Sequence, residues 1–275
     1  MAERRGRLVA GVVLLALLVG YAVVVPWAAG VDDRVTDFAA ARQGPSPAHP
    51  FGTDSAGRDL FVRTAAGLRV SLLVAVVCAV LSTVLGALVG ALSAAAGGWA
   101  DRLVMRLVDG VNAVPHLLLG IVLVALYRGS LVAIIASIAL THWTQVARIV
   151  RAEVLSLRDR EHVDAAVLAG AGRWWVTRRH LLPAVLPQAL VAATLLLPHA
   201  VWHESTLSFL GLGLPPHRAS LGTLLEEARS SLLLGGWWTL VFPALGLVLA
   251  TLAVAAVGSA LRDRAALPRR AVVEL

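Results

Sequence analysis

The chain has 275 residues, of which 58% are hydrophobic and 15% charged, whereas about a quarter of the residues of a soluble domain are charged. All 24 basic residues are arginine, and the formal net charge is +7. Because lysine is absent, the sequence excludes a P-loop ATPase, whose lysine binds phosphate, and an enzyme that works through a lysine Schiff base. The single cysteine, Cys78, excludes a disulfide framework and a thiolate metal site.

Long uncharged runs predict a protein with several membrane spans, because about 20 apolar residues cross a bilayer as a helix. The first run follows Arg4, Arg5 and Arg7. It is longer than the apolar part of a secretory signal peptide, about 7–15 residues, so we interpret it as a retained helix. We expect six spans, at about residues 8–27, 70–96, 111–127, 131–147, 182–207 and 232–261.

The second span carries small residues at a spacing of four: Ser82, Gly86, Gly90 and Ala94. Small residues on one face of a membrane helix let another helix approach closely. We therefore expect this face to pack against a neighbouring span.

The distribution of arginine predicts the topology. Six spans place both termini on one side of the membrane. If that side also holds the turn at 97–110 and the loop at 148–181, it receives most of the arginines. Arginine-rich loops and ends stay in the cytoplasm, so we expect both termini to be cytoplasmic.

We divide the chain into four parts on this basis. An N-terminal transmembrane helix occupies residues 1–30, and an extracytoplasmic loop occupies 31–69. A core of five membrane helices covers 70–261 and contains the cytosolic loop 148–183. A cytosolic tail, 262–275, ends the chain.

The cytosolic loop has a characteristic pattern of small residues. Asp164-Ala165-Ala166 is followed by Gly170 and then by Leu182-Pro183. We expect a short helix over residues 162–169, with two alanines that leave one face nearly bare. Gly170 follows where a left-handed helix end favours a residue without a Cβ atom.

Three segments of the sequence resemble one family. The spacing of Asp164-Ala165-Ala166, Gly170 and His180-Leu181-Leu182-Pro183 resembles the EAA loop of binding-protein-dependent ABC importers, with Asp164 where the family usually has glutamate. Residues 49–59 (HPFGTDSAGRD) and 204–213 (ESTLSFLGLG) resemble segments of the dipeptide, oligopeptide and nickel branch. The resemblance is to the second permease subunit of such systems and extends from about residue 49 to 261.

The resemblance implies a fold and a coupling site. The fold would be the type I ABC importer permease fold, an all-α membrane protein with six transmembrane helices and cytoplasmic termini. The loop would form a coupling helix that docks into a separate ATPase. The coupling residues would be Asp164, Ala165, Ala166, Val167, Leu168, Gly170 and Pro183.

The resemblance also implies partners and a location. The chain would be a multi-pass protein of the bacterial inner membrane that imports peptides or a similar small solute, with nickel as a further candidate. Its partners would be a homologous permease, two ABC ATPases, an extracytoplasmic binding protein and the lipid bilayer, and no nucleic acid. ATP and Mg would be bound by the ATPases, so we expect no catalytic residue, metal or cofactor in this chain.

Polar residues near the end of the fifth span suggest part of a transport pathway. His199 and His203 are four residues apart and share a helix face, a spacing that could bind a metal, and Glu204 follows them. We favour a polar patch of the pathway, because polar groups in membrane spans usually face the protein interior. The metalloprotease pattern HExxH fails because Leu207 occupies its last position.

Two other function classes have less support. An ion-gradient-driven secondary transporter is expected to have charged or discontinuous spans and inverted repeats, and the spans here are nearly uncharged. An intramembrane enzyme would need a pattern such as GxSxG, HExxH or paired aspartates within a span, and none is present.

Overall fold

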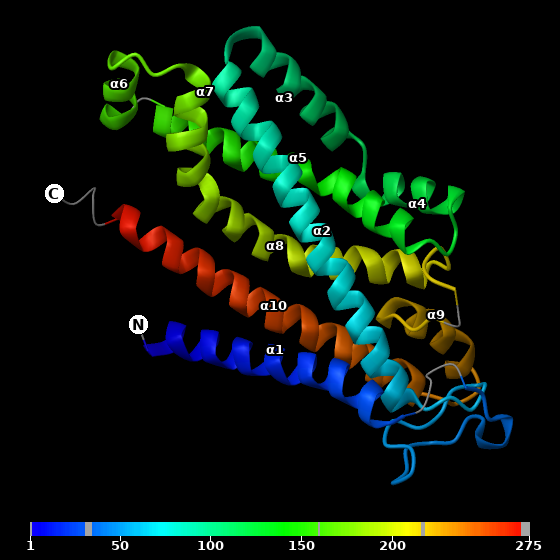
Figure 1. Cartoon of the computed structure of the whole chain (residues 1–275). Coiled ribbons are helices and arrows are strands. Elements are labelled where there is room, and N and C mark those ends of the chain that lie inside the picture. Colours follow the sequence, from blue (N-terminus) through cyan, green and yellow to red (C-terminus); the bar gives the residue numbers. More distant parts are fainter. Residues whose placement is uncertain (1, 31–34, 159, 216–217, 271–275) are drawn as a thin grey trace.

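The computed structural model describes residues 2–30, 35–158, 160–215 and 218–270, which form an elongated helical bundle (Figure 1). Each of its five longest helices contains a stretch that is long and apolar enough to cross a membrane. These helices are α1 (Ala2–Ala28), α2 (Leu60–Ala96), α5 (Leu131–Arg158), α8 (Leu182–Phe209) and α10 (Trp238–Arg270). The expected all-α membrane fold is confirmed.

The third expected span is not one straight helix. Two helices, α3 (Gly98–Ala113) and α4 (His116–Leu126), meet there at an angle of 78°. The break falls at Val114, whose backbone is extended, because the ring of a following proline, Pro115, disfavours the helical conformation at this residue. With 11 residues, α4 is only about 16 Å long, so a sixth span requires α3 and α4 together.

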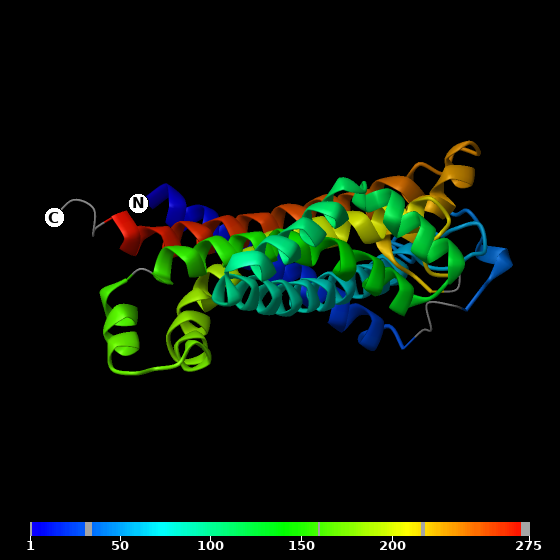
Figure 2. The ribbon, with the colours of Figure 1, turned by 90° about the horizontal axis from the view of Figure 1, so that it is seen from above.

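The bundle has two distinct ends. The first residues of α1 and the last residues of α10 lie at one end of the bundle. Helices α6 (Glu161–Leu168) and α7 (Arg173–Val176) lie at the same end (Figures 1 and 2). The short 3-10 helix η1 (Phe38–Ala40) and helix α9 (Leu221–Leu232) lie at the opposite end. The arginine-rich loop is therefore on the same side as both termini, as a cytoplasmic location of all three requires.

Helix α2 begins at Leu60, well before the expected start of the second span near residue 70. Its first turn is capped by Asp59, whose Oδ1 accepts hydrogen bonds from the backbone N–H groups of Phe61 and Val62 at 2.8 and 3.1 Å. The cap lets the helix continue beyond the apolar run and pack against the outer segments.

The small residues of α2 pack against α5. A Cβ atom added at Gly86 would overlap the backbone oxygen of Trp143, and one added at Gly90 would overlap that of Ala147. Ser82, on the same face, donates a hydrogen bond to the backbone oxygen of Ala139. The predicted close helix contact is confirmed, and α5 is the neighbour.

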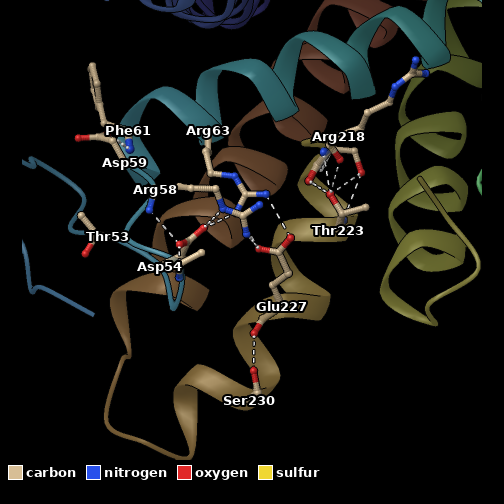
Figure 3. Close-up of polar contacts among 12 residues, drawn as sticks. Thr53, Asp54, Arg58, Asp59, Phe61, Arg63, Arg218, Thr223, Glu227 and Ser230 are labelled. Atoms are coloured by element: carbon tan, nitrogen blue, oxygen red, sulfur yellow. Dashed lines mark hydrogen bonds and ion pairs between the residues drawn. The ribbon is translucent and has the colours of Figure 1, made fainter. Parts of the chain in front are cut away.

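A buried ion network fastens the outer end (Figure 3). Arg63 of α2 is only 1% exposed, and its Nη1 lies 2.5 Å from Asp54 and 2.7 Å from Glu227 of α9. Arg58 completes the network through Nε to Asp54 at 2.7 Å and Nη2 to Glu227 at 3.0 Å. Two guanidinium groups thus balance two carboxylates, and the network joins the loop before α2, α2 itself and α9.

The close contact between α2 and α5 predicts a steep cost for a larger residue at Gly90. We expect Gly90→Val to destabilise the protein by about 1–3 kcal/mol, because the added side chain must displace the backbone of α5. Thermal unfolding of the purified protein in detergent should show a lower Tm. The matched control is Gly20→Val in α1, where a Cβ atom meets nothing within 4 Å. Equal melting temperatures for the two variants would contradict this packing.

The outer network predicts a second stability effect. Arg63→Met removes the buried guanidinium and leaves two carboxylates with Arg58 alone, so we expect a loss of about 3–5 kcal/mol. Arg69→Met, which changes an exposed arginine on the same helix, is the control and should cost little. Thermal unfolding measures both variants, and an unchanged Tm for Arg63→Met would show that the network adds nothing to stability.

Candidate functional site

Helix α6 projects from the side of the bundle at the end predicted to be cytoplasmic (Figure 2). It covers Glu161–Leu168, close to the predicted range. Val163 is its one buried residue, and it packs into a cluster with Val154 of α5 and Val176 of α7. The helix therefore has one fully buried apolar side chain and leaves most of its surface free.

The outward face of α6 combines small, acidic and apolar side chains. Asp164, Ala165 and Val167 are exposed, and Leu168 is 88% exposed. The sequence suggested that both alanines of the motif face outward, but Ala166 is half-buried against the core cluster. The reason is the turn of about 100° between successive helix residues, which points the two methyl groups in different directions.

Gly170 ends α6 in the predicted left-handed conformation. Its φ is +90°, and the N–H of Ala171 donates to the carbonyl of Ala166 at 3.0 Å, closing the helix end. A Cβ atom at Gly170 would meet nothing within 4 Å. The position thus requires glycine for its backbone conformation and not for lack of space.

The chain becomes helical again well before Pro183. Helix α7 continues into a π-helical turn, η2 (Thr177–Leu181), and this turn continues into α8. Pro183 therefore does not begin this helical stretch but lies in the first turn of α8. Proline has no N–H group, and its ring crowds the carbonyl four residues earlier, so a wider turn directly before it is physically reasonable.

An ion pair braces the bundle beside the loop. Arg151 of α5 donates two hydrogen bonds to Asp101 of α3, at 2.7 and 2.5 Å. Ser93 of α2 donates to the same carboxylate at 2.5 Å. These contacts fix the end of α5, from which the chain leads into α6.

Glu204 lies inside the bundle. Its side chain is 0% exposed and accepts hydrogen bonds from Ser71 of α2 at 2.7 Å and from Ser208 at 2.9 Å. Ser71 also accepts a hydrogen bond from the N–H of Leu221, the first residue of α9. The carboxylate thus connects α2, α8 and α9.

His203 of α8 belongs to a cluster of three histidines. The ring of His203 stands edge-on to that of His142 of α5, with 4.7 Å between ring centroids. The ring of His116, the first residue of α4, lies 5.3 Å from His142. His199 is exposed one helical turn from His203. We refer to His116, His142 and His203 as the histidine cluster.

Sequence reasoning found His203 and missed the other two members of the cluster. A spacing of four reveals neighbours on one helix, whereas the cluster joins three helices that are distant in sequence. The sequence did contain a signal for His116 and His142, because each is a polar residue in a largely apolar span, and such residues usually face the protein interior. Within the part of the chain that the structure describes, no group of three His, Cys, Asp or Glu side chains is arranged to hold a metal ion.

A family model and individual relatives both match this chain, and both indicate the same family. Residues 82–266 match the family described as binding-protein-dependent transport system inner membrane component. The oligopeptide transport system permease protein OppC of Escherichia coli (strain K12) is 39% identical over 257 residues, which cover 93% of this chain and 85% of OppC. A provisionally named peptide permease protein of Brucella suis biovar 1 is 42% identical over 254 residues, 92% of this chain and 84% of that protein.

The matched region contains the α6 loop and the whole histidine cluster. This family match favours an importer permease over an ion-gradient-driven transporter. The protein is a transport subunit of the inner membrane and not an enzyme, and the ATPase of such a system is a separate protein. The chain therefore belongs to the family of inner membrane permease components of binding-protein-dependent transport systems.

Proposed function

We propose that the chain is one of two related permease subunits of an ATP-driven importer for peptides or a similar small solute. Relatives named as peptide permeases align with more than nine-tenths of the chain, which supports this solute class. The other partners are two ABC ATPases, which bind ATP and Mg, and an extracytoplasmic binding protein. The two permeases would enclose the pathway between them.

The observation that carries this proposal is the exposed face of α6. Exposed apolar surface on a short projecting helix is typical of an interaction site. Leu168 and Val167 supply apolar area, Asp164 offers a carboxylate to a basic partner, and Ala165 lets the partner's surface approach the backbone. Gly170 closes the helix end, and Ala166 lets α6 lie close to the bundle. We therefore assign the docking of the ATPase to α6.

Two connections carry a displacement of α6 into the membrane. On one side α5 leads to the loop, and Val163 anchors α6 in the same apolar cluster as Val154. On the other side, helix is nearly continuous from Arg173 through the π-helical turn to Phe209. ATP-driven closure of the two ATPases would move α6, and α5 and α8 would move with it. Pro183 lies in the first turn of α8, on this second connection.

The pathway assignment follows from the polar groups of α8. His199 is exposed at membrane depth, and His203 is half-buried one helical turn away. We propose that both line the pathway shared with the second permease. Glu204 is buried among serines, so we propose that it stabilises the helix packing of the pathway wall instead of contacting the solute.

Assembly and transport test the function as a whole. The chain, produced together with its related permease and the ATPases, should co-purify with them. In proteoliposomes, with binding protein outside, the complex should take up a labelled tripeptide only when ATP is inside. Uptake by this chain alone, driven by an ion gradient and without ATPases, would refute the proposal.

The role of α6 makes a sharper prediction. Ala165→Trp should leave the protein folded, because the residue is exposed, but should hinder docking of the ATPase. A clash of about 1.4 kcal/mol lowers the affinity tenfold, and ATP-dependent uptake should fall accordingly. Pull-down of the ATPase and tripeptide uptake are the measurements.

The control for this variant is Ala10→Trp, an equal change at an exposed position near the cytoplasmic end of α1. It should retain both ATPase binding and uptake, since tryptophan is well tolerated at the membrane interface. Normal ATPase binding by Ala165→Trp would remove α6 from the docking surface.

A further inference from the structure

The spanning helices differ in what they expose. In the stretches 9–28 of α1, 70–96 of α2 and 241–261 of α10, every exposed side chain is aliphatic or aromatic. By contrast, α5 exposes Gln145 and α8 exposes His199 at membrane depth. Polar side chains are costly in contact with lipid, so α5 and α8 turn this side toward water or protein.

The histidine cluster lies deep in the membrane region. His142 follows the first residue of α5, Leu131, by eleven positions, which is about 16 Å of helix at 1.5 Å per residue. His203 precedes the last residue of α8, Phe209, by six positions, about 9 Å. Both helices reach the outer end at these termini, so His142 and His203 lie well away from that end, along the length of the bundle.

The hydrogen bonds of His142 fix which ring nitrogen carries the proton. Its Nδ1 lies 2.9 Å from the backbone oxygen of Ile138, and a carbonyl can only accept. The N–H is therefore on Nδ1, and Nε2 of the neutral ring carries a free electron pair. His142 itself is only 4% exposed, whereas the two rings beside it, His116 and His203, are half-buried. A solute would therefore reach the cluster from the side of His116 and His203.

The other two rings also have unused hydrogen-bonding capacity. Among the described residues, no hydrogen bond reaches either ring nitrogen of His116 or His203, or Nε2 of His142. A polar group at this depth without a partner costs free energy unless water or a solute satisfies it. Among the described residues, no hydrogen bond or ion pair joins a carboxylate to these rings, and Glu204, the neighbour of His203 in sequence, is engaged by serines. The cluster is therefore suited to transient hydrogen bonding with a polar solute.

We propose that His116, His142 and His203 form a recognition site in the translocation pathway that accepts hydrogen bonds from N–H groups of the transported solute. The inference rests on the proposed function and specifies what its pathway recognises. Amide and amino N–H groups are the donors that a neutral imidazole nitrogen accepts. A metal ion fits less well, because the described side chains include no arrangement that could hold one.

The test replaces His142 in two ways in the complete transporter. His142→Phe keeps a ring of similar size and removes the acceptor, whereas His142→Gln keeps an acceptor near the position of Nε2. The probe is labelled trialanine, taken up by proteoliposomes that contain both permeases and the ATPases, with binding protein outside. Because the same binding protein serves every variant, differences in uptake report on the permease.

We expect uptake by His142→Phe to fall about tenfold, while ATPase binding and basal ATP hydrolysis stay at the wild-type level. His142→Gln should recover most of the uptake. His203→Phe and His203→Gln form a second pair with the same expected order. The control is Thr251→Val in α10, which removes a hydroxyl group that bonds within its own helix at 2.8 Å, and its uptake should not change.

Each other result overturns the site. Wild-type uptake by both phenylalanine variants, or equal loss in the glutamine and phenylalanine variants, would show that the acceptor has no role. Loss of labelled Ni²⁺ uptake with trialanine uptake intact would identify a metal site instead. If the wild-type complex binds its ATPases but takes up no trialanine, the peptide assignment fails, and the recognition site fails with it.

Discussion

The close contact between α2 and α5 is the constraint on which the rest of the structure depends. Gly86 and Gly90 bring the backbones of the two helices together, which larger residues would prevent. This contact sets the position of α5, and α5 in turn carries His142 at its middle and leads into α6 at its cytoplasmic end. Between membrane helices there is little hydrophobic driving force, so such packing and a few hydrogen bonds must hold the bundle. A small-residue stripe on one helix thus determines where both functional regions lie.

Polar groups inside the bundle fall into two classes. Glu204 and Arg63 are buried, yet Glu204 accepts hydrogen bonds from serines and Arg63 forms ion pairs with Asp54 and Glu227, as burial of charged groups in a medium of low dielectric constant requires. These residues hold helices together. The histidine cluster differs, because most of its ring nitrogens have no partner within the described residues. Paired groups explain stability, whereas unpaired groups at the same depth need another explanation, and a solute pathway supplies one.

The sequence was sufficient for the helical membrane fold, for the loop helix and for the left-handed glycine at residue 170, because each follows from local rules. Apolar run length predicts a span, and a glycine after a short helical pattern predicts its end. Three features depended on tertiary structure or on local competition. The break before Pro115 reflects a proline effect that run length does not register. Ala166 turns inward because α6 packs on the bundle, and His116 joins His142 only because α4 folds back against α5.

The order of elements along the chain connects the two functional regions. Helix α6 lies between α5 and α8 in sequence, and these two helices carry the closest pair of the cluster, His142 and His203, with 4.7 Å between ring centroids. Any displacement of α6 that moves α5 and α8 unequally must therefore change the separation of these two rings. Because α2 restrains α5 through its glycines, and the π-helical turn lies between α6 and α8, unequal movement is the expected response. A force that an ATPase applies to α6 would thus change the arrangement of the rings that bind the solute. One motion can therefore both open the pathway and weaken solute binding.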